Sequence, residues 1–360
     1  MIPGTDWRTG RGNALVDSTS CHTFVAVALL ALATLSCGGG AGKPVLRQTT
    51  AMNTYVNVTV YDDLPGERVN HMIDSAVAEI RRIEDMATDY SDSSDVGRIN
   101  LASGKHPVQV SDELIELIRM SLAYGDSSSG MLDITVGPLV KTWDFLSAQP
   151  RVPPEDSIHA LLHLVDYHLV KLNGRSVFLP LKGMALDLGS LGKGYAIEKA
   201  CEVLTRFGAK RFIVDIGGKL GVRWEATRGL DSTVVTVSVR HPRKEGAFLG
   251  TFKYGTGAVA TSGDYQRYFI VNGKRYHHIL DPQTGYPVQG LVGVTVVTQN
   301  ATEADALSTL VLALGKEKWM EYILKTPGLE GMITYEVDDS LRTDFSSGFK
   351  GKFSFDQTNK

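Results

Sequence analysis

The sequence predicts an α+β fold, in which β-hairpins and mixed sheets are packed with helices. Two Asn-Gly pairs, at 173–174 and 272–273, stand between apolar-rich runs. Such pairs are typical of two-residue hairpin turns, because both turn positions need a positive φ. Helical segments are interspersed with these hairpins without strict strand–helix alternation, which favours α+β over a doubly wound sheet.

The elements of the first third follow from periodicity and capping. Residues 56–60 alternate apolar and polar side chains, which predicts a strand buried on one face. Apolar residues recur every three or four positions over 69–87 and predict an amphipathic helix. We expect a polar loop over 89–100, and a second helix that Ser111 caps and that runs to about Tyr124.

The rest of the chain contains further strands and three more helices. The expected strands cover 132–136, 168–172, 176–179, the start of 184–194, 212–216, 233–240, 292–298 and 331–337. A helix is expected after the glycine loop at 189–194, with Gly208 at its C-terminal end. The last two helices are expected at about 303–314 and 316–325. Cys201 falls on the apolar face of its helix and is expected in the core.

Composition and charge argue against a nucleic-acid-binding protein. The chain has 360 residues, of which 43% are apolar and 21% charged, as in ordinary globular proteins. Its formal net charge of −3 gives no basic footprint for nucleic acid.

The N-terminus resembles a bacterial lipoprotein signal. Arg8 and Arg11 precede an apolar run over 24–35, which is too short to span a bilayer but fits a signal peptide. Cys37 follows Ser36 and begins a glycine-rich stretch, so we expect it to be lipidated. A plain secretory signal or a misplaced start codon is the alternative.

The stretch 261–287 contains two adjacent histidines beside a polar turn. Strand alternation puts His277 and His278 on opposite faces, so at most one of them faces any given pocket. The spacing does not choose between them, and a buried structural histidine is the alternative to a functional one.

Three other groups could take part in chemistry. Asp305, Ser308 and Thr309 share one helix face and offer the hard oxygen ligands that Mg²⁺ prefers, although Asp305 could instead complete a capping box with Thr302 as N-cap. The loop 189–194 could cradle a phosphate with Lys193, or its glycines could serve close packing. Asp133 and Asp187 lie in apolar surroundings, where a carboxylate is either a site residue or hydrogen-bonded to nearby backbone.

Six blocks of sequence, taken in order, closely resemble the FAD:protein FMN transferases, the ApbE-type flavin transferases. They are Asp-Ile-Thr-Val-Gly-Pro-Leu-Val at 133–140, Leu-Asp-Leu-Gly with Lys-Gly-Tyr-Ala within 186–196, Val-Asp-Ile-Gly-Gly at 214–218, Thr-Ser-Gly-Asp-Tyr at 261–265, His-Ile-Leu-Asp-Pro-Gln-Thr-Gly at 278–285 and Ala-Asp-Ala-Leu-Ser-Thr at 304–309. The resemblance extends from about Gln48 to Val337. The chain departs from the usual pattern at Asn53, where the family has Gly, and at Gly97, where it has Ser.

The resemblance implies Mg²⁺-dependent cleavage of FAD at its pyrophosphate, with FMN joined by a phosphoester to a Ser or Thr of a target protein and AMP released. It implies that Asp305 and Thr309 ligate Mg²⁺, with Ser308 and the backbone oxygen of Ser190 close by. The residues implied to line the FAD site are Met52, Tyr90, Met131, Leu132, Asp133, Asp187, Lys193 and Ile279. His278 matches the histidine tied to flavin transfer.

The resemblance also divides the chain into a signal peptide at 1–36, a lipidated tether at 37–47, a catalytic domain at 48–340 and a C-terminal tail at 341–360. We expect an enzyme anchored by its lipid in the bacterial cell envelope and facing the periplasm. The expected acceptors are extracytoplasmic flavoproteins, such as subunits of membrane redox complexes. The alternatives are an FAD pyrophosphatase that makes FMN and AMP, and a flavin-binding lipoprotein without chemistry.

Overall fold

The structure of the protein is a computed structural model that describes residues 43–226 and 232–357. The expected signal peptide and Cys37 lie outside these residues. Within them, no helix combines the length and the apolar character needed to cross a bilayer.

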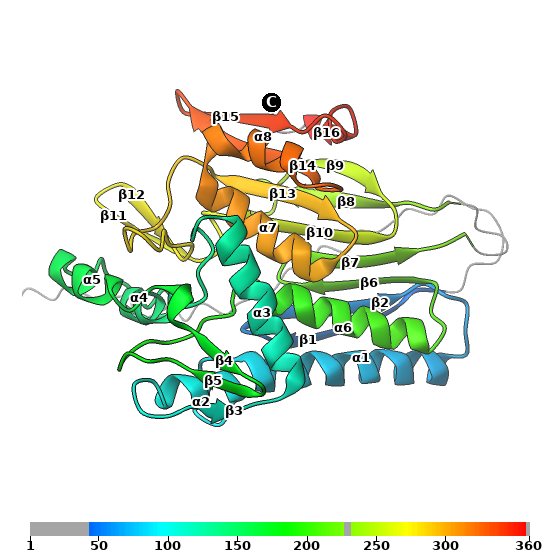
Figure 1. Ribbon diagram of the computed structural model, residues 1–360. Helices are drawn as coiled ribbons and strands as arrows, with labels where there is room; N and C mark the ends of the chain where they lie inside the picture. The colour runs from blue at the N-terminus through cyan, green and yellow to red at the C-terminus, as the bar shows by residue number, and fades with distance from the viewer. Residues whose placement is uncertain (1–42, 227–231, 358–360) are drawn as a thin grey trace, which may run out of the picture. The chain divides into compact units, whose positions relative to one another are not determined.

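The main sheet has eight strands in the order β1-β2-β6-β7-β10-β13-β14-β15, and every neighbouring pair is antiparallel (Figure 1). Its strands are β1 (Val45–Ala51), β2 (Thr54–Val60), β6 (Arg211–Ile216), β7 (Lys219–Trp224), β10 (Gly257–Gly263), β13 (Gly293–Thr298), β14 (Glu330–Val337) and β15 (Ser340–Phe345). The α+β prediction is therefore confirmed, with an antiparallel sheet in place of a mixed one.

Helices cover one face of this sheet and a smaller sheet covers the other. The helices are α1 (Gly66–Ala87), α2 (Asp95–Leu101), α3 (Asp112–Ser127), α4 (Gly137–Trp143), α5 (Glu155–Leu162), α6 (Gly192–Arg206), α7 (Ala301–Leu314) and α8 (Lys316–Lys325), with a 3-10 turn at Tyr167–Leu169. Helices α1, α6 and α7 lie side by side across the sheet (Figure 1). Their apolar faces and the sheet residues beneath them form the principal core.

The remaining strands form three small sheets. They are β8 (Val235–Arg240), β9 (Phe248–Tyr254) and β16 (Phe353–Phe355), then β3 (Val108–Gln109), β4 (Lys171–Asn173) and β5 (Ser176–Phe178), and finally β11 (Tyr268–Val271) with β12 (Lys274–His277). The first of these packs its apolar residues against the face of the main sheet opposite α7.

Residues expected outside the catalytic domain contribute strands to it. Residues 45–47, expected in the tether, begin β1 and pair with β2. Residues 341–345 and 353–355, expected in the tail, form most of β15 and all of β16, which pair with β14 and β9. The Phe345 ring of β15 packs against Phe353 and Phe355 of β16, so aromatic contacts join these two strands, which do not pair with each other.

Hairpin β11–β12 is braced by an aromatic cluster. Its turn residues Asn272 and Gly273 both have positive φ, which confirms the predicted turn. The ring of Phe269 stacks on Tyr276, and Trp143 of α4 packs against both rings. The Trp143 indole N–H also donates to the Gly285 carbonyl at 2.8 Å. The hairpin and the turn that follows it are thus fixed to α4.

Several local predictions were wrong. No strand forms at the start of 184–194, where only Ala185 makes an isolated bridge, and the strand expected from 168 begins at Lys171, after the 3-10 turn. Residues 95–101, expected in a polar loop, form α2, because the Ser94 hydroxyl accepts from the Gly97 N–H and caps a short helix. Residues 132–136, expected as a strand, form turns that lead into α4, and only Val136 makes an isolated bridge. The β4–β5 turn consists of residues 174 and 175, since Asn173 pairs with Ser176.

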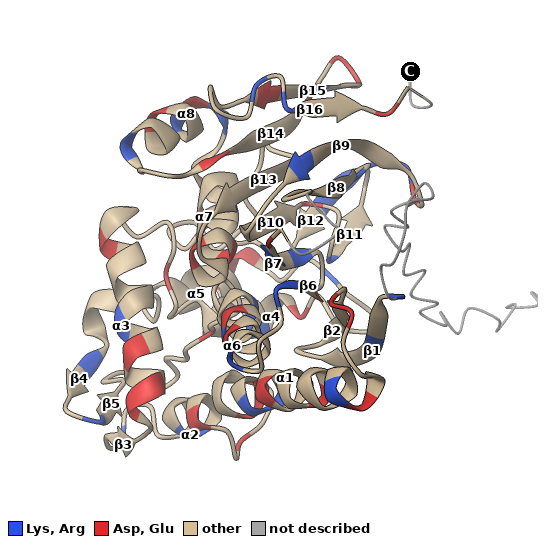
Figure 2. Cartoon of the chain, turned by 90° about the vertical axis from the view of Figure 1, so that its right-hand side faces the viewer, with Lys and Arg blue, Asp and Glu red and all other residues tan. Residues whose placement is uncertain are grey.

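Charged residues of both signs are interspersed along α1 and the other outer helices (Figure 2). On α1, for example, Arg82 pairs with Glu79 and also with Glu113 of α3. No element of the described part of the chain carries a continuous basic stripe in this view.

Candidate active site

Asp305 is the centre of a buried polar cluster beneath α7. Its side chain is 0% exposed, and a carboxylate in such a place requires partners. The Gly194 N–H donates to Oδ2 at 2.8 Å, and the Lys219 ammonium lies 2.8 Å from Oδ1. Lys219 itself is only 4% exposed. Oδ1 accepts no hydrogen bond of good geometry, so its contact with Lys219 is an ion pair.

Three hydroxyls surround this ion pair. Ser308 and Thr309 follow Asp305 by three and four residues and therefore share its helix face. Ser262 of β10 lies 2.8 Å from the Ser308 Oγ and 3.3 Å from the Thr309 Oγ1, measured between hydroxyl oxygens. Ser262 belongs to the stretch 261–287, so that stretch contributes to this cluster as well as providing the histidines.

The capping-box interpretation of Asp305 is wrong. The N-cap of α7 is Asn300, whose side chain accepts from the Glu303 N–H at 2.9 Å. Asp305 is therefore in the second turn of the helix, and its carboxylate reaches across to α6 and β7. Gly194, in the loop at 189–194, explains how α6 comes so near to α7.

Loop 189–194 packs tightly and uses most of its N–H groups within the chain. The N–H groups of Gly189, Leu191, Gly192 and Gly194 donate to Asp187, Leu188 and Asp305. A Cβ at Gly194 would lie 2.2 Å from the Ala301 carbonyl oxygen, so only glycine lets this N–H reach Asp305. The loop therefore serves close packing of α6 against α7, and the phosphate-cradle hypothesis is not supported by its N–H groups.

The structure distinguishes the two histidines. His277 ends β12, is 2% exposed, and its Nε2 donates to the Val288 carbonyl at 2.7 Å. His278 keeps a buried Nδ1 that has no hydrogen-bond partner among the described residues. Burial lowers the pKa of His278 well below 6.5, and the nearby cations Arg267, Lys193 and Lys219 lower it further. His278 is therefore a neutral imidazole with a free ring nitrogen, and His277 is structural.

Cations other than Lys219 lie around His278. Lys193 donates to the Gly189 carbonyl at 2.9 Å, and its pKa is lowered by burial while Asp305 opposes that shift. Arg267 donates to the Asn53 carbonyl at 3.3 Å. Several cations close to one carboxylate favour an anionic ligand. Sequence reasoning missed Lys219, Arg267 and Ser262, although the block at 261–265 included the last.

Tyr90 lies close to the carboxylates of Asp89 and Asp187. Tyr90 is 63% exposed, so its side chain is accessible to a ligand. The pKa of neighbouring Asp89 is raised to about 6 by burial and by the charge of Asp187. Asp187 accepts from the Gly189 N–H at 2.6 Å. The charges of Asp89 and Asp187 raise the pKa of Tyr90, and the nearby positive charge of Arg267 opposes that shift.

The other predicted flavin contacts divide into two groups. Met52 lies in the β1–β2 turn with its methyl group near Gly192, at the N-terminal end of α6. Asp133 instead uses both oxygens internally, accepting from the Thr135 N–H and hydroxyl and from the Tyr167 N–H. Burial raises the pKa of Asp133. Its carboxylate is thus hydrogen-bonded within the chain.

The remaining predicted residues vary in exposure. Leu132 and Ile279 are buried in the principal core, and Met131 packs against its edge. Ser190 is half-buried, two residues before the start of α6.

Both departures from the family's usual pattern have a local explanation. Asn53 has a φ of 56° in the β1–β2 turn, a conformation that Asn tolerates. At Gly97 a Cβ would lie 1.9 Å from the Ser91 carbonyl oxygen. The loop that carries Tyr90 is therefore folded too tightly against α2 for a side chain at this position.

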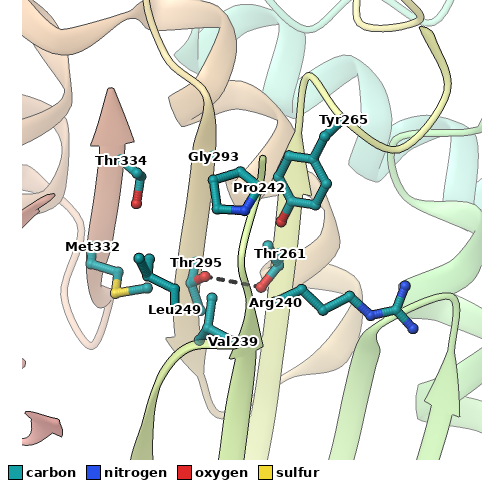
Figure 3. A pocket seen from close by; sticks show the side chains of 10 residues that line it. All are labelled: Val239, Arg240, Pro242, Leu249, Thr261, Tyr265, Gly293, Thr295, Met332 and Thr334. Atoms are coloured by element: carbon teal, nitrogen blue, oxygen red, sulfur yellow. Dashed lines mark hydrogen bonds between the residues drawn. The ribbon is translucent and has the colours of Figure 1, made fainter. Parts of the chain in front are cut away.

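A small hollow of about 10 Å³, enough for roughly one water, lies on the other face of the sheet (Figure 3). Thr261, Thr295 and Tyr265 contribute to its lining, and the two threonine hydroxyls are 2.9 Å apart. Because strand alternation points Thr261 away from Ser262, this hollow does not open onto the Asp305 cluster.

Comparison with known proteins gives consistent matches. The ApbE family model matches residues 52–333. The FAD:protein FMN transferase of Escherichia coli (strain K12) is 31% identical over 346 residues, which cover 91% of this chain and 97% of that protein. That of Klebsiella pneumoniae (strain 342) is 36% identical over 242 residues, covering 66% and 74%.

Two solved structures share the fold. The ApbE protein of Thermotoga maritima superposes with a TM-score of 0.77 at 30% identity, over 86% of this chain and 99% of that one. The flavin transferase ApbE of Vibrio cholerae gives a TM-score of 0.73 at 24% identity, over 86% and 98%.

Proposed function

This chain belongs to the ApbE family, and on that basis we propose that it is an FAD:protein FMN transferase. In the proposed reaction, a Ser or Thr hydroxyl oxygen of a target protein attacks the FMN phosphorus of FAD. The bond from that phosphorus to the AMP phosphate breaks, and AMP leaves. The observation that carries the proposal is the buried Asp305 cluster, with basic residues and an unpartnered neutral His278 beside it.

The donor atoms of the cluster fit Mg²⁺. The Asp305 carboxylate and the hydroxyls of Ser308 and Thr309 are hard oxygen ligands, and the buried Asp305 Oδ1 is ion-paired with Lys219 and accepts no hydrogen bond. These residues would hold the ion, with the Ser190 backbone oxygen as a further candidate. When bound, Mg²⁺ neutralises charge on the pyrophosphate.

His278 is suited to accept the proton of the attacking hydroxyl. Its lowered pKa keeps the imidazole neutral near pH 7, and its Nδ1 is free among the described residues. Its backbone N–H donates to the Arg267 carbonyl at 3.1 Å, and the neighbouring His277 is fixed to Val288. The backbone that carries the ring is therefore fixed before substrate arrives, which reduces the entropic cost of proton transfer.

The other residues bind and orient FAD. Lys193 and Arg267 supply positive charge for its phosphates, and the exposed Tyr90 ring can stack on the isoalloxazine. Met52 and Ile279, together with Met131, Leu132, Asp133 and Asp187, would form the surrounding wall. Fixing both ends of FAD places the reacting phosphorus relative to His278.

We propose that the enzyme is anchored in the bacterial cell envelope through a lipid on Cys37 and faces the periplasm. This proposal is supported by the apolar run at 24–35 and the cysteine that follows it. Its acceptors would then be extracytoplasmic proteins, such as subunits of membrane redox complexes.

One experiment tests the function against its alternatives. The protein is incubated with FAD, Mg²⁺ and candidate extracytoplasmic proteins, and the products are analysed by fluorescence and mass spectrometry. Covalent FMN on a Ser or Thr, absent with Asp305→Ala, supports transfer. Free FMN and AMP without labelled protein indicates an FAD pyrophosphatase, and unchanged FAD contradicts both enzymatic functions.

A further inference from the structure

Lys219 occupies the position next to Asp305 that a metal ion would need. Its ammonium lies 2.8 Å from the Asp305 Oδ1, 3.4 Å from the Ser262 Oγ and 3.5 Å from the Ser308 Oγ. Three oxygens therefore surround a single positive charge inside the protein. The site already contains a cation, and that cation is part of the chain.

The ammonium and a divalent ion cannot both use Asp305 Oδ1. The other carboxylate oxygen of Asp305 is engaged by the Gly194 N–H. Among the described residues, no group of three or more His, Cys, Asp or Glu side chains is placed to hold a metal. The cluster therefore offers little negative charge beyond Asp305, and two cations within a few ångströms repel each other strongly where water is excluded.

Lys219 is well placed to compete with a divalent ion for the Asp305 carboxylate. It is the first residue of β7, directly after the turn at Gly217 and Gly218, and its neighbour β10 carries Ser262. Its ammonium is thus held beneath α7 by the strand, while its long flexible side chain allows it to move aside.

We propose that Lys219 is an internal competitor of the divalent cation, so that metal binding requires its ammonium to leave Asp305 Oδ1. This inference rests on the proposed function, which supplies the metal. Lys219 is a positioning residue: it neutralises Asp305 in the metal-free protein and lowers the protein's affinity for the metal alone. A bound pyrophosphate gives the displaced ammonium a new partner, so FAD and metal strengthen each other's binding.

The test is calorimetric titration of the metal-free protein with Mg²⁺, without FAD, in wild type and in Lys219→Met. Met keeps the length of the side chain and removes its charge. We expect the variant to bind Mg²⁺ about tenfold more tightly or better, because close charge pairs couple by at least that factor. Lys219→Arg, which keeps a charge, should bind as weakly as wild type. Lys199→Met, at a surface lysine paired with Glu202, is the matched control and should not change the affinity.

An equal or weaker Mg²⁺ affinity in Lys219→Met overturns the inference. If that variant is poorly folded without metal, Mg²⁺ should raise its melting temperature at concentrations that leave wild type unchanged, and absence of that rescue also overturns it. Failure of the proposed function has a different signature, because wild type would then leave no FMN on any acceptor whatever the affinities show.

Discussion

Replacing Asp305 by Asn is the most informative single change, because it removes a charge and keeps the shape of the side chain. The amide oxygen of Asn can still accept from the Gly194 N–H, which lies 2.8 Å from the Asp305 Oδ2. The amide nitrogen cannot balance the Lys219 ammonium, which lies 2.8 Å from Oδ1. The variant therefore leaves a buried cation without its partner.

The expected cost follows from burial. Asp305 is 0% exposed and Lys219 is 4% exposed, so solvent screens the pair very little. Removing one partner of such a pair lowers the free energy of unfolding by about 3–5 kcal/mol, mainly because the remaining charge is uncompensated. Adding Lys219→Met to Asp305→Asn removes that charge and should recover most of the loss, giving a coupling energy of about 3 kcal/mol.

The assay is urea unfolding of wild type, both single variants and the double variant, followed by far-ultraviolet circular dichroism. Transfer of FMN is measured in parallel at saturating FAD and Mg²⁺. We expect the double variant to be folded and inactive, which separates the structural role of Asp305 from its metal role. If Asp305→Asn unfolds within about 1 kcal/mol of wild type, or if the two changes are simply additive, the ion pair does not stabilise the site as argued. Full transfer activity in Asp305→Asn would refute its role as a metal ligand.

Three further predictions concern the histidines and the Tyr90 loop. His278→Ala should keep FAD bound while slowing transfer by about 10²-fold or more. His277→Ala should mainly lower the melting temperature. Loss of FAD binding in His278→Ala would mean that the role of His278 is structural. Burial and nearby cations lower the pKa of His278 below 6.5, so the neutral base persists at about pH 7. The transfer rate should therefore be flat down to about pH 6.5 and fall only as the pH drops through that lowered pKa. A pH profile that falls already between about pH 8 and 7 would contradict this assignment. Gly97→Ser should lower the free energy of unfolding by about 2 kcal/mol, because its Cβ would meet the Ser91 carbonyl oxygen at 1.9 Å; a urea midpoint equal to that of wild type would show that the loop yields freely.

Local patterns in the sequence were enough for elements whose formation depends on near neighbours. Alternation predicted β2, three- and four-residue spacing predicted α1, and the Asn272-Gly273 pair predicted its hairpin turn. Local prediction failed where the decisive contact is a single cap or a turn. Helix α2 depends on one Ser94 hydroxyl. Leu132, Ile134 and Val136 alternate with polar residues as they would in a strand, although this largely buried segment forms turns.

The two histidines show the limit of periodicity. Alternation could say that His277 and His278 face opposite ways, but it could not say which one is satisfied. The answer depends on the Val288 carbonyl, which returns to the hairpin eleven residues later and engages the His277 Nε2. That contact leaves His278 as the residue with a free buried nitrogen.

Motifs and spacing along the chain were enough to predict the family, the α+β class and the helix face that carries Asp305, Ser308 and Thr309. The surroundings of Asp305 depend instead on how the elements pack. The Lys219 ammonium, the Ser262 hydroxyl and the Gly194 N–H come from β7, β10 and α6, and they meet α7 only when the sheet and its helices pack together. A buried charge is paired across such distances in sequence because water cannot reach it, and no local pattern reveals which partner it takes.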